Sequence, residues 1–343
     1  MKALVLEEYR KLVYKDVPIP EIGMDDVLVK VHACGICGSD VHGYDGRTGR
    51  RIPPIVMGHE AAGVVEETGP GVTRFKPGDR VTFDSTVYCG TCGFCRQGRI
   101  NLCDRRRVLG VSCADYRRDG AFAEYVAVPE RIVYPLPDAM TFAQAAMVEA
   151  VSIAVHAVAR TKIALNDTAV VVGAGMIGLL VIQAARAAGC GRIVALDVDA
   201  DKLALAERLG ATDTVRVSVS DPVHAVLSMT DGRGADVVFE AVGVEESVAA
   251  ALACVRKGGQ VTLVGNLAPS VAFPLQSAVT REITLNGSCA SSGEYPACLD
   301  LIARGTVNVD ALISAVAPLS EGAAWFERLY AREPGLMKVV LQP

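Results

Sequence analysis

Hydrophobic and polar residues alternate along the first part of the chain. The alternation covers residues 2–8, 11–17 and 26–33 and is typical of antiparallel strands with one buried face. Similar segments predict further strands at 61–68, 79–83 and 121–128, and the dipeptides Pro70-Gly71 and Pro77-Gly78 predict turns. We therefore expect the first 140 residues to be mainly β.

The pattern changes near residue 169. Apolar strand-like runs at 169–172, 192–197, 236–241 and 260–264 alternate with helical segments at 175–188, 199–209 and 245–256. This alternation is typical of βαβ units and predicts an α/β domain with a parallel sheet. Thr141 can cap a connecting helix that runs through Phe142 to about Arg160. After Asn286 we expect helices at 295–304 and 321–332 and a final strand at 336–341.

Size and charge narrow the class of protein. A chain of 343 residues is too long for one ordinary core, so we expect two domains. The net charge of −5 gives no general basic field for nucleic acid or an anionic membrane, which favours small-molecule chemistry. The uncharged run 168–185 is long enough to raise the question of a membrane span, but its spaced glycines suit a cofactor motif better. The start Met1-Lys2-Ala3 has no secretory pattern, so we expect a reducing, cytoplasmic location.

Residues of metal-binding type lie close together in two short segments. The first is Cys37-Gly38-Ser39-Asp40-Val41-His42, and the second begins Gly58-His59-Glu60. A thiolate, an imidazole and a carboxylate are zinc ligands, and three protein ligands leave the fourth tetrahedral position open for water or substrate. The second segment continues with Gly63, Gly69 and Val72, and its full spacing resembles the zinc signature of the medium-chain dehydrogenase/reductase superfamily.

A second metal site is indicated by four cysteines within fifteen residues: Cys89, Cys92, Cys95 and Cys103. Their spacing predicts one closed, all-cysteine structural zinc site. The seven-residue gap before the last cysteine, and Asp104 after it, argue against an iron–sulfur cluster. The six other thiols have no metal spacing and are interpreted as ordinary cysteines: Cys34, Cys113, Cys190, Cys254, Cys289 and Cys298.

A glycine-rich turn follows the predicted strand at 169–172 and opens a helix: Gly173-Ala174-Gly175-Met176-Ile177-Gly178. Such a turn binds the pyrophosphate of a dinucleotide at the helix N-terminus. Asp197 ends the next strand nineteen residues after Gly178, where a carboxylate would bind the ribose hydroxyls and favour NAD over NADP. Strand ends predict the further cofactor-binding residues Val242, Val264, Gly265 and Asn266.

These motifs together resemble the zinc-dependent medium-chain dehydrogenases, and most closely the sorbitol (polyol) dehydrogenase group. The resemblance implies a GroES-like, mainly β catalytic domain (1–150 and 286–343), a doubly wound Rossmann domain (151–285), and a homotetramer or homodimer. It implies zinc ligation by Cys37, His59 and Glu60, and it places Glu149 as a fourth ligand or as the group that hydrogen-bonds the zinc water. Ala150 departs from the proline usual after this glutamate. Lys202 would stand beside the adenosine ribose, which weakens a strict preference for NAD.

The implied reaction oxidises a secondary alcohol of a polyol to a ketose and transfers the hydride to NAD. Ser39 would take the alcohol proton, and His42 would deliver it to solvent through the nicotinamide ribose. Asp40 would accept a hydrogen bond from the imidazole of His59.

Substrate and class remain open at this point. The polar loop after the first segment could bind polyol hydroxyls, could bind a phosphate through its arginines, or could simply be solvated; its residues include Tyr44, Asp45, Arg47, Arg50 and Arg51. Polyol-phosphate, 2,3-butanediol and threonine dehydrogenases are alternatives within the group. A zinc-free quinone reductase, or a non-catalytic protein that binds zinc and NAD, is disfavoured by the complete ligand set and by Ser39 and His42.

Overall fold

The computed structural model describes residues 1–112 and 117–343 and divides the chain into two units. The first unit comprises Met1–Glu149, Ser292–Arg304 and Val309–Pro343, and the second comprises Ala150–Ser291 and Gly305–Asn308. We expected the chain to return to the first unit at 286, but strand β16 (Thr284–Gly287) still belongs to the sheet of the second. Cys113 lies outside the described residues.

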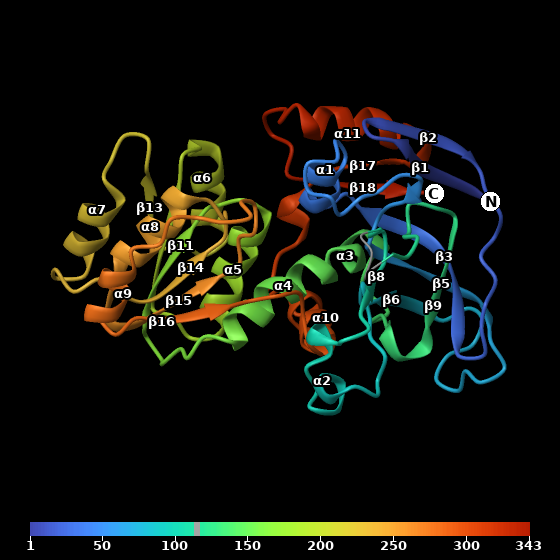
Figure 1. Cartoon of the computed structure of the whole chain (residues 1–343), viewed down its shortest axis with the longest axis horizontal. Helices are drawn as coiled ribbons and strands as arrows, with labels where there is room; N and C mark the ends of the chain where they lie inside the picture. The colour runs from blue at the N-terminus through green and yellow to red at the C-terminus, as the bar shows by residue number, and fades with distance from the viewer. Residues whose placement is uncertain (113–116) are drawn as a thin grey trace. The chain divides into compact units, whose positions relative to one another are not determined.

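The first unit is built from two main β-sheets (Figure 1). A three-stranded sheet has the order β2-β1-β4, and a larger sheet has the order β10-β6-β5-β3-β18-β17, with β9 also paired to β3. A short pair, β7 and β8, stands apart. The strands are β1 (Lys2–Glu8), β2 (Lys11–Asp16), β3 (Asp26–Gly35), β4 (Ile55–Val56), β5 (Glu60–Thr68), β6 (Arg80–Phe83), β7 (Thr86–Val87), β8 (Arg107–Val108), β9 (Tyr125–Pro129), β10 (Val133–Pro135), β17 (Ile313–Pro318) and β18 (Lys338–Gln342).

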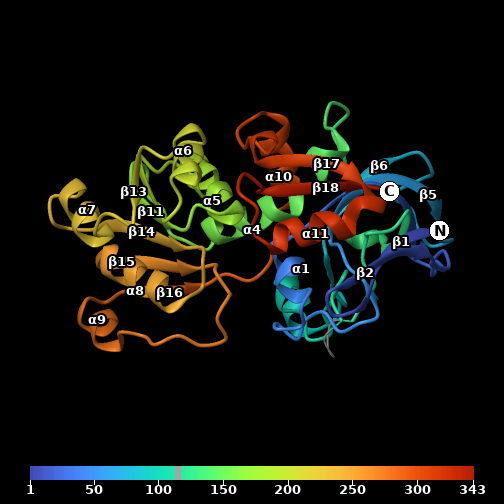
Figure 2. The same ribbon diagram turned by 90° about the horizontal axis from the view of Figure 1, so that it is seen from above.

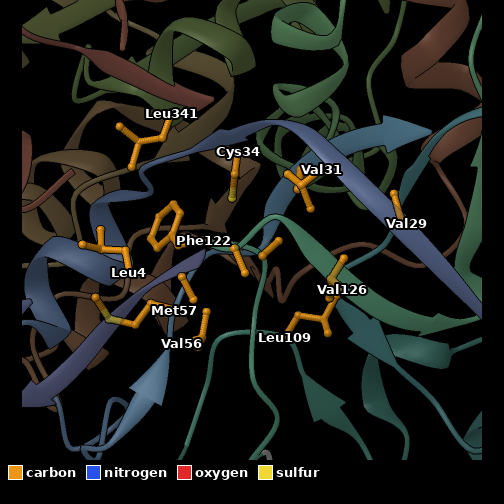
Figure 3. Packing of buried hydrophobic residues seen from close by; sticks show 14 of the residues in the cluster. Leu4, Val29, Val31, Cys34, Val56, Met57, Leu109, Phe122, Val126 and Leu341 are labelled. Atoms are coloured by element: carbon orange, nitrogen blue, oxygen red, sulfur yellow. The ribbon is translucent and has the colours of Figure 1, made fainter. Parts of the chain in front are cut away.

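The predicted strand at 121–128 is shorter than expected. Phe122 donates its N–H to the Met57 carbonyl and accepts from the Leu4 N–H, so these residues bond to separate segments and not to one continuous ladder. Figure 3 shows the Phe122 ring among Leu4, Cys34 and Met57 in the core of this unit. The strand itself starts at Tyr125, and the preceding residues connect the two sheets.

Short helices complete the first unit. They are α1 (Gly38–Gly43), α2 (Gly93–Arg96), α3 (Phe142–Ala146), α10 (Tyr295–Ala303) and α11 (Gly322–Tyr330), with one-turn 3₁₀ helices at Ile100–Leu102, Glu130–Ile132, Asp310–Leu312 and Leu319–Glu321.

The connecting helix predicted from Phe142 to about Arg160 is broken. Thr141 caps it as expected, because its hydroxyl accepts from the Gln144 N–H and the Gln144 side chain accepts from the Thr141 N–H. The Met147 N–H then bonds back to the Gln144 carbonyl, a three-residue step that tightens and ends α3. A second helix, α4 (Val148–Ala159), begins at once and carries Glu149 in its first turn.

The second unit is a doubly wound α/β domain. Its six-stranded parallel sheet has the order β13-β12-β11-β14-β15-β16. Figure 2 shows α5 and α6 on one side of this sheet and α8 on the other. The remaining strands are β11 (Thr168–Val172), β12 (Arg192–Asp197), β13 (Asp213–Arg216), β14 (Ala235–Glu240) and β15 (Val255–Leu263), and the helices are α5 (Met176–Ala187), α6 (Ala200–Arg208), α7 (Pro222–Met229), α8 (Glu245–Cys254) and α9 (Leu275–Thr280).

The expected fold class, a GroES-like β domain with a Rossmann domain, is confirmed. The sequence had not predicted the short elements β4, β7, β8, β10, α1 and α2 or the strand β17, nor β13, α7, α9 and β16 in the second unit. The uncharged run 168–185 forms β11, the glycine turn and most of α5, and in the described part of the chain no helix has the length and apolar character needed to span a membrane.

Candidate functional site

Cys37, His59 and Glu60 come together in the first unit, with one potential ligand atom from each lying within 4.8 Å of the others. Cys37 follows β3, and Glu60 begins β5, which pairs with β3 in antiparallel register at Gly35. The strand pair therefore brings two segments that are distant in sequence to one place. Gly63 makes this pairing possible, because a Cβ there would stand 2.0 Å from the Lys30 carbonyl oxygen. His59 and Glu60 are buried, as suits ligands in a shielded centre.

The thiol of Cys37 is surrounded by hydrogen-bond donors. Cys37 is the N-cap of α1, and its sulfur accepts from the Ser39 N–H at 3.4 Å and from the Ser39 hydroxyl at 3.2 Å. These two donors fix the position of the sulfur, and a cysteine binds a metal as its thiolate. The donor set of thiolate, imidazole and carboxylate fits zinc, and three ligands leave one position open.

Asp40 lies behind His59 and is completely buried. Its Oδ2 is 3.5 Å from His59 Nδ1, an ion-pair distance without hydrogen-bond geometry, which leaves the opposite ring nitrogen for a metal. Its Oδ1 accepts from Arg51 Nη2 at 2.7 Å and Nε at 3.1 Å. Burial alone would raise the pKa of Asp40, but the charges of His59 and Arg51 hold it far below its ordinary value.

Glu60 has a partner that sequence reasoning missed. Lys338, at the start of β18, directs its ammonium group to Glu60 Oε2 and to the Ile36 carbonyl, and both side chains of the ion pair are about fully buried. The only sequence signal was a lysine within the apolar run 336–341. A buried lysine needs a charged partner, so this run implied a buried acid without indicating which one.

Glu149 is not one of the three residues whose ligand atoms cluster most closely. Its Oε1 accepts from the Ser85 hydroxyl at 3.4 Å. Burial, together with the charges of Glu60 and Asp84, raises the pKa of Glu149 to about 7, against the opposing effect of His59 and Lys338. This carboxyl therefore belongs to the same electrostatic cluster.

The loop after α1 differs from the expected solvent-facing polar surface. Tyr44 is buried and donates its hydroxyl to Glu327 at 2.6 Å, while Asp45 accepts from the Tyr330 hydroxyl at 2.8 Å. Arg51 is 2% exposed and paired with Asp40. These three residues are committed to protein contacts, which argues against their recognising a polyol or a phosphate.

His42 lies in the last turn of α1 and is partly buried. Burial lowers its pKa, and the positive charges of Arg332 and Arg47 lower it further, against a smaller opposing effect of Asp45. A lowered pKa keeps the imidazole neutral, and therefore able to accept a proton, over a wider pH range.

The four cysteines predicted as a structural zinc site also cluster, with all four sulfurs within 4.8 Å of one another. The sulfur of Cys103 accepts from the N–H of Cys89 at 3.2 Å, and that of Cys89 accepts from the N–H of Cys92 at 3.4 Å. The backbone N–H of Thr91 lowers the pKa of Cys89 most, and the N–H of Cys92 with the Thr91 and Cys103 side chains lowers it further, to about 5, against the opposing effect of burial. A cluster of thiolates with backbone donors fits tetrahedral zinc.

In the second unit, the glycine turn has the shape expected of a pyrophosphate site. A Cβ on Gly178 would lie 1.8 Å from the Gly173 carbonyl oxygen, so helix α5 packs directly on the turn. A Cβ on Gly175 would meet nothing within 4 Å, and no side chain caps the first N–H groups of α5. Open space in front of free N–H groups fits an anionic ligand. Met176 and Ile177 form the first turn of the helix.

Asp197 ends β12 beside this turn. Its Oδ2 accepts from the Ala174 N–H at 2.7 Å, and its Oδ1 accepts from the Asp199 N–H at 2.9 Å. The cap of α6 is Asp199, whose side chain accepts from the N–H groups of Asp201 and Lys202. Asp197 therefore does not cap α6 and is left at the end of β12 beside the glycine turn.

Two further loops approach the same edge of the sheet. Glu240, at the end of β14, accepts from the N–H groups of Val242 and Gly243, and its carbonyl accepts from Val264 and Gly265. Glu240 thus joins both loops, the first through its buried carboxylate and the second through its backbone carbonyl. Asn266 follows directly, so the predicted cofactor-binding strand ends are adjacent.

Comparisons with known proteins agree with these two units. Residues 23–138 match the family model "Alcohol dehydrogenase GroES-like domain", and residues 177–304 match "Zinc-binding dehydrogenase". The chain is 34% identical to sorbitol dehydrogenase of Bacillus subtilis, over 100% of this chain and 97% of that protein. It is 36% identical to D-arabitol-phosphate dehydrogenase of Enterococcus avium, over 97% of this chain and 94% of that protein. A solved zinc-binding dehydrogenase of Sinorhizobium meliloti bound to NADP is 36% identical, with a TM-score of 0.91 over 100% and 99%.

Proposed function

Because the chain belongs to the zinc-binding medium-chain dehydrogenases, we propose that it oxidises a secondary alcohol of a polyol to a ketose with transfer of hydride to NAD. The observation that carries the proposal is the meeting of the partly exposed Cys37 with the buried His59 and Glu60 in one cluster, with the Ser39 hydroxyl bonded to the Cys37 sulfur. Relatives that act on sugar alcohols or their phosphates support a polyol substrate.

Cys37, His59 and Glu60 would hold the catalytic zinc, and Glu149 would serve as a further ligand or hydrogen-bond the zinc water. When bound, zinc supplies a Lewis acid that acidifies the alcohol, and NAD accepts the hydride. Ser39 would receive the alcohol proton, since its oxygen already accepts from Arg51 and its position is fixed beside Cys37. His42, kept neutral by its lowered pKa, would pass the proton to solvent.

The four-cysteine cluster would hold a structural zinc, because four protein ligands would complete a tetrahedral site and would leave no position for substrate. Its role would be to close the loop from Cys89 to Cys103. Removing this metal would therefore affect stability more than chemistry.

NAD would bind at the edge of the parallel sheet, with its pyrophosphate at Gly173, Gly175 and Gly178. The carboxylate of Asp197 would bind the adenosine ribose and repel a 2′-phosphate, while Lys202 would offer a nearby positive charge. A similar structure contains NADP, so the test must include both cofactors.

A phosphorylated polyol is the second candidate substrate, suggested by the D-arabitol-phosphate relative. Of the three arginines in the loop after α1, Arg47 and Arg50 are exposed, whereas Arg51 is buried in its ion pair. Only Arg47 and Arg50 could therefore bind a phosphate. 2,3-Butanediol and threonine are the two other candidate substrates within the group.

The test follows reduction of NAD and NADP over free polyols, polyol phosphates, 2,3-butanediol and threonine, before and after zinc removal and after zinc is restored. We expect a zinc-dependent rate on free polyols. If the enzyme prefers polyol phosphates, and this preference disappears in Arg47→Gln or Arg50→Gln, the substrate class is polyol phosphates and not free polyols. If no compound of the panel gives a zinc-dependent rate, the proposal is refuted.

We also infer a homo-oligomer, a dimer or tetramer, formed through β16. This strand is last in the sheet order, and among the described residues no further strand pairs with its outer edge. β16 exposes Leu285, and the segment between β15 and β16 exposes three more apolar side chains: Leu267, Leu275 and Val279. An edge strand without a neighbour favours pairing with a second copy. Size-exclusion chromatography with light scattering tests this, and a monomer in the wild type, or an unchanged oligomer after Leu285→Lys, would contradict it.

A cytoplasmic location is the remaining inference. Cys37 and the four cysteines of the structural site must stay reduced to bind zinc, which a reducing compartment ensures. Fractionation of cells that express the protein would check this, and recovery outside the cytoplasm would overturn it.

A further inference from the structure

Arg51 occupies an unusual place for a loop arginine. It follows the exposed residues Arg47 to Arg50, yet its side chain is 2% exposed. Its guanidinium group makes two hydrogen bonds to Asp40 Oδ1, at 2.7 and 3.1 Å, and Nη2 also donates to the Ser39 hydroxyl oxygen at 3.3 Å. One side chain thus touches both the acid behind His59 and the hydroxyl beside Cys37.

Helix α1, which carries Ser39 and Asp40, leaves room for the side chain of Arg51. Gly43 is in the last turn of α1, and a Cβ there would lie 2.4 Å from Arg51 Cγ and 3.2 Å from Arg51 Cβ. These atoms belong to the base of a buried side chain, so they cannot swing away as the end of a flexible chain could. Glycine at this position therefore allows Arg51 to reach Asp40.

The two contacts have different consequences for the centre. Both hydrogen bonds from Arg51 to Asp40 go to Oδ1, which leaves Oδ2 to accept from the Cys37 N–H at 3.4 Å and to face His59 Nδ1 at 3.5 Å. The bond to Ser39 uses the hydroxyl oxygen as an acceptor, so the Ser39 proton remains directed at the Cys37 sulfur. Arg51 consequently contacts the partners of two different residues proposed as zinc ligands.

We propose that Arg51 is a positioning residue of the catalytic metal centre, which fixes Asp40 against His59 and the Ser39 hydroxyl against Cys37. The inference rests on the proposed function, in that it takes Cys37, His59 and Glu60 as the zinc ligands. The planar fork of arginine can bond Asp40 and Ser39 at once, whereas a lysine ammonium is a point charge on a flexible stem. A substitution by lysine should therefore restore only part of the effect.

Zinc retention tests the proposal without relying on activity. The zinc-loaded proteins are dialysed against a series of chelator concentrations, and zinc per chain is measured by atomic absorption. A Cys37→Ser variant identifies which of the two losses belongs to the catalytic centre. The four-cysteine site in the same molecule then serves as an internal reference, since Arg51 is not among its contacts.

In Arg51→Gln we expect the catalytic zinc to be lost at a chelator concentration about tenfold to a hundredfold lower, the range for partners that orient metal ligands. Arg51→Lys should fall between this variant and the wild type. Gly43→Ala should resemble Arg51→Gln, because the added methyl group displaces the arginine. Its matched control is Gly38→Ala in the same helix, where a Cβ meets nothing within 4 Å and the metal should be retained as in the wild type.

Unchanged retention of the catalytic zinc in both Arg51→Gln and Gly43→Ala would overturn the inference. An equal loss from the four-cysteine site would also overturn it, because the effect would then be general destabilisation. If Arg51→Gln does not fold, Gly43→Ala carries the test, since it leaves the charges in place. If the wild type shows no zinc that depends on Cys37, the proposed metal centre itself is wrong, an outcome separate from these.

Discussion

Substituting two glycines of one turn should separate cofactor binding from folding. Gly175 and Gly178 are both part of the glycine motif, but their surroundings differ. Alanine at Gly175 fits the backbone, whose φ of −73° and ψ of −174° suit any residue, and its Cβ meets nothing within 4 Å. Stability should therefore change by only a few tenths of a kcal/mol, because the poorer N-cap preference of alanine, about 0.5–1 kcal/mol, is offset by the lower entropy of alanine in the unfolded chain, about 0.4–1 kcal/mol.

The same methyl group would occupy the space in front of the first N–H groups of α5. If it prevents one charge-assisted hydrogen bond to the pyrophosphate, the loss is about 1.5–3 kcal/mol. That loss corresponds to NAD affinity about tenfold to a hundredfold weaker.

Alanine at Gly178 has the opposite consequence. Its Cβ would stand 1.8 Å from the Gly173 carbonyl oxygen, so backbone must move by about 1 Å. Because the clash is with backbone, the cost should lie at the upper end of the range for overpacking, about 3 kcal/mol, and the better helix propensity of alanine returns up to about 1 kcal/mol, which leaves a net loss of about 2 kcal/mol. The melting temperature should fall by about 2–4 °C for each kcal/mol of net loss.

Calorimetry supplies both measurements: titration with NAD gives the affinity, and scanning gives the melting temperature. We expect Gly175→Ala to melt like the wild type and bind NAD weakly, and Gly178→Ala to melt earlier. Wild-type NAD affinity in folded Gly175→Ala would refute the placement of the pyrophosphate, and an unchanged melting temperature in Gly178→Ala would refute the close approach of helix and turn.

Three further outcomes are expected. Lys338→Met leaves Glu60 buried without its partner, so the free energy of unfolding should fall by about 3–5 kcal/mol in the metal-free protein and by less in the zinc-bound protein. Urea unfolding of both forms checks this, and an equal loss in the two forms would contradict it. Arg332→Asn keeps a residue that suits the left-handed backbone there (φ 56°) and removes a positive charge. This charge is, next to burial, the largest cause of the lowered pKa of His42. Because only neutral His42 accepts a proton, activity is lost as pH falls through this pKa, and the acid limb of the kcat profile should move to higher pH; an unmoved limb excludes His42 as the proton acceptor. Cys103→Ser should reduce the zinc content from two atoms to one per chain and lower the melting temperature. A zinc analysis that still finds two atoms per chain would contradict this.

Local patterns predicted the fold well where each element carries its own signal. The alternating strands β1 to β3 and the glycine turn before α5 are set by nearby residues, and the sequence placed them within one or two residues. Strand β13 and helix α9 are short and half-exposed, and their periodicity is too weak to distinguish them from loops. The break at Met147 depends on a single tightened turn, which no hydrophobic pattern records.

The candidate site shows the same division. Ligand types and spacing pointed to Cys37, His59 and Glu60, whose roles as zinc ligands remain predictions. The partners of that centre were not predictable, because charge alone does not tell a buried arginine from a solvated one. Arg51 was grouped with its exposed neighbours, and its burial follows from the space at Gly43 and the acid at Asp40. Lys338 could not be assigned to Glu60 without the neighbouring strands.

The ion pair between Glu60 and Lys338 also orders events during synthesis. The ribosome must add 278 residues after Glu60 before Lys338 exists, and β18, which carries Lys338, pairs with β3. The whole parallel sheet of the second unit is made in that interval and can fold while β3 still lacks this neighbour. A nascent chain therefore holds Glu60 without its buried counter-charge until late in translation, and a cation captured early could neutralise it in the meantime. Zinc would then act first as a folding partner of the unfinished chain.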